Sequence, residues 1–129
     1  MVGQAIAPRT KPSILLVDDE KLLLQACALM LELEGFHVVV AGDGEEALVL
    51  ARSVRPEIVV TDLNMPVCDG ADLCRALKAD VSLAATPVIV CTASTWFAPV
   101  GLCDGVLRKP VDRATLLQLI SALLSRTLL

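Results

Sequence analysis

Short apolar runs alternate with longer amphipathic stretches along most of this chain. The runs cover residues 14–17, 37–41, 58–60, 88–91 and 106–107. Runs that are apolar at nearly every residue are typical of strands covered on both faces, whereas half-exposed strands alternate apolar and polar residues. The stretches between them have the spacing of amphipathic helices. This strict alternation predicts an α/β fold with one doubly wound, five-stranded parallel sheet and right-handed crossovers.

Turn and cap residues set the expected ends of the helices. Gly35 suits the left-handed position that closes a helix. Asp43 has Glu46 three residues later, which predicts a capping box, and Pro56 stops the helix that follows. Asp112 is the expected N-cap of the last helix. The predicted helices cover about 21–34, 43–54, 69–79 and 112–126.

Length and composition predict one domain. The chain has 129 residues, 55% of them apolar, which is enough to bury a core. Residues 1–12 are small, polar or proline-containing, so we expect a flexible N-terminal tail before a domain that covers 13–127. No apolar stretch approaches the ~18 residues of a membrane span, and the tail lacks the apolar stretch of a secretory signal. We therefore expect a cytoplasmic location and no membrane partner.

Charge and side-chain chemistry narrow the function further. The net charge of −4 argues against direct nucleic acid binding, because nucleic-acid surfaces gather Lys and Arg. Two Phe, one Trp and no Tyr leave no stacking platform for bases. The five cysteines form no C-x-x-C pair and there is a single histidine, so a zinc site has few ligands. We expect the cysteines to fill apolar space.

Polar residues follow or end the predicted strands. Asp18 and Asp19 follow the first, Asp62 the third, Thr92 the fourth and Lys109 the fifth. Because the carboxyl ends of parallel strands meet at one edge of the sheet, these side chains should converge. Carboxylates, a lysine and a hydroxyl suit a divalent cation and a phosphoryl group. Taken alone, the aspartate pair could instead cap the next helix, and the third aspartate could simply end a strand.

Four sequence segments together resemble the response-regulator receiver family, the CheY-like domains of two-component signalling. They are I-L-L-V-D-D-E at 14–20, T-D-L-N-M-P-V-C-D-G at 61–70, C-T-A at 91–93 and K-P at 109–110. The resemblance covers about residues 13–127. It implies a flavodoxin-like sheet with the strand order 2-1-3-4-5. It also implies a phosphorelay function in which the phosphorylated receiver domain switches protein–protein contacts.

The resemblance implies roles for the acidic residues. Asp62 matches the phosphoacceptor, which takes a phosphoryl group from a sensor histidine kinase or a phosphotransfer protein. A carboxylate that attacks an anionic phosphate needs a cation to offset the repulsion, and Mg²⁺ suits oxygen ligands. Asp19 matches the direct metal ligand and Asp18 the one that acts mainly through water. The acceptor carboxylate and the backbone carbonyl of Asn64 complete the implied magnesium site.

The remaining site residues are implied in the same way. Lys109 matches the lysine that pairs with the acceptor and later with the phosphoryl oxygens. Thr92 matches the hydroxyl that bonds the phosphoryl group, beside the backbone N–H of Ala93. The Lys109–Pro110 peptide is implied to be cis. Such a domain is no enzyme in the ordinary sense, because it catalyses only its own phosphorylation and dephosphorylation.

The sequence departs from the family at two places that concern the switch. Val106 stands where the family usually has Tyr or Phe, and valine has no large ring to move. The stretch from Thr92 to Lys109 is shorter than usual and contains Pro99, so the fourth family helix should be one or two turns or missing. Trp96, followed by Phe97, could replace the missing aromatic as the moving part. The two could also simply cover the core that the lost helix leaves bare.

The last helix is the other candidate contact surface. Its apolar residues span more than the ~100° stripe that one buried face needs, so some should face outward. An outward set could form a homodimer patch or a dock for a partner. The residues are Leu116, Leu117, Leu119, Ile120, Leu123 and Leu124.

Two rival functions stay open at this point. The first is a degenerate receiver domain that acts as an unswitched interaction module, which Val106 and the short segment favour. The second is a metal-dependent phosphatase that forms an aspartyl phosphate, which Asp62-Leu63-Asn64 faintly suggests. Such enzymes usually carry the nucleophile after the first strand and need more chain for a substrate cap, which argues against the second.

Overall fold

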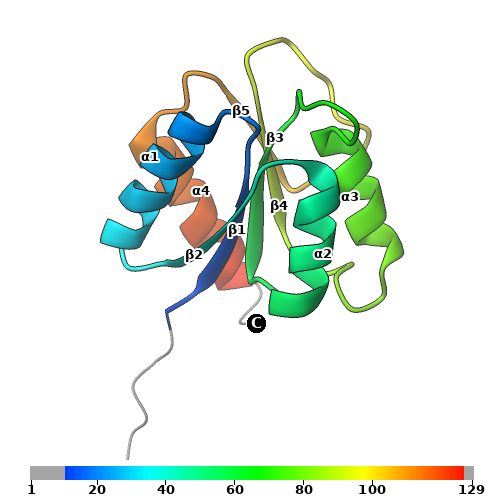
Figure 1. Cartoon of the computed structure of the whole chain (residues 1–129), viewed down its shortest axis with the longest axis horizontal. Helices are drawn as coiled ribbons and strands as arrows, with labels where there is room; N and C mark the ends of the chain where they lie inside the picture. Colours follow the sequence, from blue (N-terminus) through cyan, green and yellow to red (C-terminus); the bar gives the residue numbers. More distant parts are fainter. Residues whose placement is uncertain (1–10, 127–129) are drawn as a thin grey trace, which may run out of the picture.

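A computed structural model describes residues 11–126, and the five predicted strands and four predicted helices are all present (Figure 1). Residues 1–10 of the expected tail and residue 127 of the expected domain lie outside the described residues. The described helices include none long and apolar enough to cross a membrane. The elements are β1 (Ser13–Val17), α1 (Lys21–Leu33), β2 (His37–Ala41), α2 (Gly44–Val54), β3 (Ile58–Asp62), α3 (Gly70–Ala79), β4 (Val88–Thr92), β5 (Gly105–Arg108) and α4 (Arg113–Arg126).

All five strands are parallel and form one sheet in the order β2-β1-β3-β4-β5, which confirms the expected topology. The register places Val17 beside Thr61, and Asp62 beside Cys91. The last residues of β1, β3 and β4 therefore lie along the same edge of the sheet. Because each strand ends there, residues that are distant in sequence meet at that edge.

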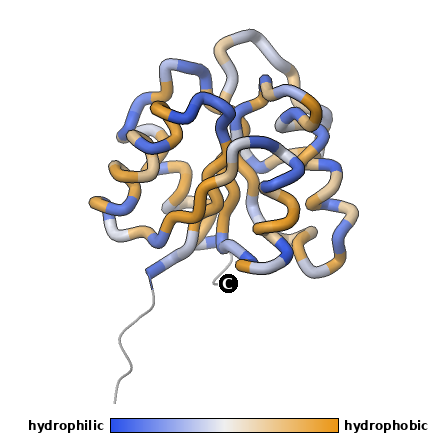
Figure 2. The backbone as a smooth tube through the Cα atoms, viewed as in Figure 1, coloured by the Kyte–Doolittle hydropathy of each residue, from blue (hydrophilic) through white to orange (hydrophobic). Residues whose placement is uncertain are grey.

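Helices α1 and α4 cover one face of the sheet, and α2 and α3 cover the other (Figure 1). Successive residues of a strand point to opposite faces, so each strand contributes to both cores. In β1, Leu15 packs with the α2 and α3 side, whereas Ile14 and Leu16 pack with the α1 and α4 side. The apolar strands at the centre of Figure 2 are thus buried on both faces.

The segment between β4 and β5 contains no helix, which confirms that the fourth family helix is missing. Leu102 is buried in the α2 and α3 core, and Trp96 is half-buried against it. These two side chains cover apolar surface that a helix would otherwise cover. Phe97 does not share that role, because it is 88% exposed. Val106 is also exposed, at 40%.

The expected outward apolar face on the last helix is wrong. In α4, Leu116, Ile120 and Leu123 are buried, and the other three residues of the predicted set are half-buried against the same core. The helix receives apolar contacts from the sheet, from α1 and from the segment that precedes it, so its wide apolar stripe is used internally. The structure therefore gives no support for a homodimer through this helix.

The helix caps follow the sequence with one difference. Asp112 caps α4 by accepting from the backbone N–H of Thr115 at 3.0 Å. Asp43 accepts from the backbone N–H of Glu46 at 2.8 Å, as in the expected capping box. The Glu46 carboxylate, however, accepts from the N–H of Gly42 at 2.6 Å and not from that of Asp43. The reciprocal bond therefore forms one residue earlier than predicted.

Candidate functional site

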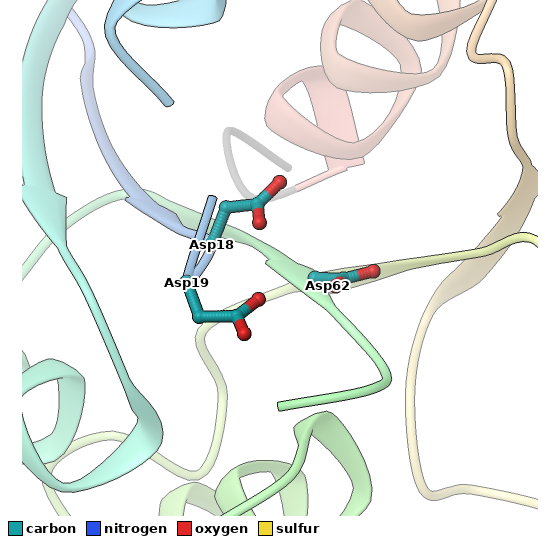
Figure 3. Close-up of side chains that lie close together, drawn as sticks. All are labelled: Asp18, Asp19 and Asp62. Carbon is teal, nitrogen blue, oxygen red and sulfur yellow. The ribbon is translucent and has the colours of Figure 1, made fainter. Parts of the chain in front are cut away.

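Three aspartates converge at the carboxyl edge of the sheet (Figure 3). One carboxylate oxygen from each of Asp18, Asp19 and Asp62 lies within 4.8 Å of the others. Asp62 ends β3 and is only 8% exposed, whereas Asp18 is half-buried and Asp19 is exposed. Three hard oxygen ligands of this spacing, open to solvent on one side, suit Mg²⁺ with water in its remaining positions.

Lys109 is the cation of the cluster. Its Nζ lies 3.0 Å from Oδ1 of Asp62 and 3.7 Å from Oδ2 of Asp18. Its backbone N–H donates to the carbonyl of Thr92 at 2.8 Å, so the end of β4 fixes its position. The Lys109–Pro110 peptide is cis, the form that the family resemblance implies. Lys109 directly follows β5, so its side chain reaches across β4 to the buried carboxylate at the end of β3.

Electrostatics of the cluster favour an added cation. Burial raises the pKa of the Asp62 carboxyl, Lys109 lowers it, Asp18 and Asp19 raise it again, and the net direction is upward. Burial alone would lower the pKa of Lys109, but its pairing with Asp62 outweighs that effect and the pKa rises. The cluster thus contains three carboxylates and one ammonium, which pairs with Asp62 and Asp18. A divalent cation would offset the uncompensated negative charge.

The aspartate pair does not cap the following helix, so that alternative is wrong. The N-cap of α1 is Glu20, and no side chain caps the first turn. Asp18 Oδ1 instead accepts from the backbone N–H of Glu20 at 2.9 Å, which turns the chain away from β1. The carboxylate of Asp19 lies close to those of Asp18 and Asp62 (Figure 3).

Thr92 ends β4 at the same edge of the sheet, and its hydroxyl contacts Ser94, a partner that the sequence did not indicate. The side chain is 1% exposed, and its Oγ1 lies 3.1 Å from Oγ of Ser94 and accepts from the Ser94 N–H at 3.2 Å. Ser94 therefore sets the direction of the threonine hydroxyl. The T-x-S spacing is the only sequence signal for this contact, and it is too common to single out.

Two further predicted site residues lie on loops at this edge. Ala93 follows β4 and lines a cavity of about 670 Å³ between α1 and α4 that also reaches Lys109. Asn64 is exposed, two residues after Asp62. Its position fits a carbonyl that faces a bound ion, and that role stays a prediction.

Gly70 brings the first turn of α3 against the backbone of the acceptor strand. A Cβ at this position would lie 2.5 Å from the carbonyl oxygen of Asp62 and 2.9 Å from Cα of Leu63. The N–H of Gly70 donates to the Leu63 carbonyl at 2.8 Å, and a reciprocal capping box between Asp69 and Asp72 begins the helix. The Asp-Gly pair thus sets how closely α3 approaches the site.

Val67 is a strained residue in the loop between β3 and α3. Its φ is 68°, a left-handed conformation that costs an L-residue roughly 1–2 kcal/mol and is rare for a β-branched one. The side chain is 88% exposed, so packing offers little in return. We expect Val67→Asn to raise the free energy of unfolding by about 1 kcal/mol, because Asn tolerates this conformation. Urea unfolding would measure it, and an unchanged or lower stability would contradict the strain.

The thiols fill apolar space, as predicted. All five cysteines are free, and Cys74 and Cys91 are buried. Burial raises the pKa of both to about 12, so these two thiols stay protonated and unreactive at neutral pH. Cys27 is half-buried against the α1 and α4 core.

Comparison with known proteins identifies the family. A family model described as response regulator receiver domain matches residues 14–121. The chain belongs to this family. Protein PilH of Pseudomonas aeruginosa is 36% identical over 118 residues, which cover 87% of this chain and 97% of that protein. The DNA-binding response regulator MtrA of Mycobacterium tuberculosis is also 36% identical over 118 residues, covering 88% of this chain and 50% of MtrA.

Solved receiver structures agree with the fold. The chemotaxis response regulator CheY4 of Vibrio cholerae superimposes with a TM-score of 0.80 at 30% identity, covering 88% of this chain and 99% of that one. A receiver protein from Pseudomonas putida gives 0.77 at 32% identity, covering 89% and 99%. The chain spans about half the length of the MtrA-type relatives and nearly all of the single-domain ones. Some relatives, such as MtrA, therefore contain a large segment outside the part that matches this chain, whereas others, such as PilH, match it over nearly their whole length.

Proposed function

We propose that this receiver domain takes a phosphoryl group onto Asp62 from the phosphohistidine of a sensor kinase or a phosphotransfer protein. A carboxylate oxygen of Asp62 would form a bond to phosphorus while the bond from phosphorus to the histidine nitrogen breaks, and the imidazole takes up a proton. The observation that carries the proposal is the pairing of this buried carboxylate with Lys109 at 3.0 Å, beside two further aspartates. The resulting aspartyl phosphate would switch protein contacts.

The carboxylates of Asp18, Asp19 and Asp62, with the carbonyl of Asn64, would hold Mg²⁺. When bound, the ion supplies positive charge that offsets repulsion between the acceptor and the incoming phosphate. The fit rests on the carboxylate oxygens within 4.8 Å of one another and on the excess of negative charge around a single lysine. No other described residues form a comparable cluster of metal-binding side chains.

Lys109 and Thr92 would hold the transferred group. The lysine ammonium, already bonded to the acceptor, would turn to a phosphoryl oxygen once the acceptor charge is used in the new bond. The Thr92 hydroxyl would donate to another phosphoryl oxygen, with Ser94 bonding it from behind. The Ala93 N–H lies beside them in sequence. These residues would also serve the domain's own dephosphorylation, the only other reaction we assign to it.

The cavity beside the site would receive the partner. It lies between α1 and α4, is lined mainly by apolar side chains such as Leu23, Met30 and Leu116, and includes Lys109 at one end. A helix that carries a phosphohistidine fits such a groove. We also propose that the receiver domain spans residues 13–127 and that it acts in the cytoplasm.

An unswitched interaction module remains a second candidate. It is favoured by the exposed Val106 and by the missing helix, which together remove the usual moving parts of the output face. Phosphorylation distinguishes the two. We expect a single phosphoryl adduct by intact-mass spectrometry after incubation with acetyl phosphate and Mg²⁺, and loss of the adduct when EDTA replaces Mg²⁺. Absence of an adduct despite detectable Mg²⁺ binding would favour the unswitched module.

A further inference from the structure

Helix α1 is apolar on two opposite faces. Its inner face packs Leu24, Ala28 and Leu31 against the sheet, and all three are buried. The outer face nevertheless presents leucines to solvent: Leu22 is 82% exposed, Leu29 58% and Leu33 78%. An amphipathic surface helix carries polar residues on its outer side, and a helix that is apolar nearly all round is normally buried. The outer face of α1 therefore has the composition of a covered surface.

Four exposed apolar residues of α1 form a narrow seam, and the exposed Leu23 lies on its flank. Leu22, Ala26, Leu29 and Leu33 are all exposed and are spaced by four, three and four residues. At 3.6 residues per turn they fall within an arc of about 60°, on the side opposite the residues that face the sheet. A seam of this width and spacing is the pattern by which one helix packs against another.

The spacing of the seam favours a second copy of the same helix. A four-three-four spacing reads the same in both directions, so two antiparallel copies related by a two-fold axis would be self-complementary. Leu22 would lie opposite Leu33 of the second copy, and Ala26 opposite Leu29 of the second copy. The small alanine would be matched by a large leucine at each of the two central positions.

Charge selects the same arrangement. Lys21 and Glu32 both lie on one flank of the seam, near opposite ends of the helix. In an antiparallel pair the equivalent flanks meet, so each lysine would lie near the glutamate of the other copy, twice by symmetry. In a parallel pair this flank would meet the opposite one, where Leu23 and Met30 stand. The charges thus complement each other only in the antiparallel arrangement.

We propose that α1 pairs with α1 of a second copy of this chain, antiparallel about a two-fold axis. The proposal goes beyond phosphoryl transfer and does not depend on it. Ala26 also lines the cavity that reaches Lys109, but Leu22, Leu29 and Leu33 do not line it and lie outside the acidic cluster, so variants at these three leucines leave the site chemistry intact.

Sedimentation velocity from micromolar to near-millimolar concentration tests the pairing. The wild type should shift from monomer to dimer with rising concentration. Leu29→Glu should raise the dissociation constant at least tenfold. Val81→Glu is the matched control, because Val81 is 97% exposed in the turn after α3 and should leave dimerisation unchanged. Circular dichroism would show that each variant is folded. Adduct formation from acetyl phosphate, measured on the same variants, would show whether phosphorylation persists when dimerisation is lost, so that failure of the pairing and failure of the proposed function can be told apart.

A charge exchange tests the orientation. Lys21→Glu and Glu32→Lys should each weaken the dimer several-fold, and the combined variant should restore it. A wild type that stays monomeric at the highest concentration would overturn the proposal, as would a dimer that Leu29→Glu does not weaken. A monomer that instead binds a phosphotransfer protein through these leucines would assign the seam to that partner and equally overturn the pairing. Failure of the combined variant to restore the dimer would exclude the antiparallel form.

Discussion

Asp62→Asn should accept no phosphoryl group from acetyl phosphate in the presence of Mg²⁺, whereas the wild-type chain should gain one. An amide oxygen is a much weaker nucleophile than a carboxylate, and it carries no charge for Lys109 or a metal ion to balance. The substitution is nearly isosteric at a position that is 8% exposed, so the fold should persist. Intact-mass spectrometry measures the difference directly, and circular dichroism confirms the fold.

Glu45→Gln provides the matched control for this prediction. It makes the same change of charge on an exposed residue of the first turn of α2 that is not part of the acidic cluster. The control should be phosphorylated as the wild type is. An adduct on Asp62→Asn of the same yield would show that another carboxylate accepts the group, and the roles assigned to the cluster would then be wrong.

Gly70→Ala should lower the free energy of unfolding by about 2 kcal/mol, within the range of about 1–3 kcal/mol that is typical when an extra carbon is forced into a packed site. The added carbon would approach the Asp62 carbonyl oxygen to 2.5 Å, a distance that real Cβ contacts essentially never show. The opposing atoms belong to the backbone of β3 and its following loop, which cannot rotate away as a side chain can. Alanine's better helix propensity offsets at most about 1 kcal/mol of this cost. Urea unfolding would measure the loss.

Gly42→Ala separates the clash from the general effect of replacing a glycine. A Cβ on Gly42 would meet only a Glu46 carboxylate oxygen at 3.7 Å, an ordinary contact with a flexible side chain. Its stability should change little. If Gly70→Ala were as stable as Gly42→Ala, α3 would not approach the acceptor strand as closely as described. Slower phosphorylation of Gly70→Ala than of Gly42→Ala would further show that this approach positions Asp62.

The sequence predicted the fold because its signals agree with one another. Fully apolar strands can be covered only on both faces, and their alternation with helices leaves the parallel sheet as the consistent solution. Polar residues at the strand ends then had to meet at one edge. This explains why Asp18, Asp62 and Lys109 could be grouped before any coordinates were known. Pro99 and the short segment around it likewise predicted the missing helix correctly.

Features that depend on packing between distant elements could not be predicted from the sequence. The apolar stripe of α4 is wider than one face needs, and nothing local shows that α1, β5 and the preceding segment absorb it. Helix α1 also carries apolar residues on two sides, and their periodicity does not show which side is exposed to solvent. The Ser94 contact depends on how the chain turns after Thr92. The left-handed conformation of Val67 contradicts the preference of valine, so only the surrounding loop could reveal it.

The most direct test of the central claim is the chemical location of the phosphoryl group. Sodium borohydride reduces an acyl phosphate to an alcohol, so a phosphorylated aspartate becomes homoserine while free carboxylates are unchanged. Wild-type protein treated with acetyl phosphate and Mg²⁺, reduced, digested and sequenced by tandem mass spectrometry should carry homoserine at position 62 alone. Homoserine at position 18 or 19, or no conversion in protein that carries the phosphoryl adduct, would contradict the assignment of Asp62 as the phosphoacceptor.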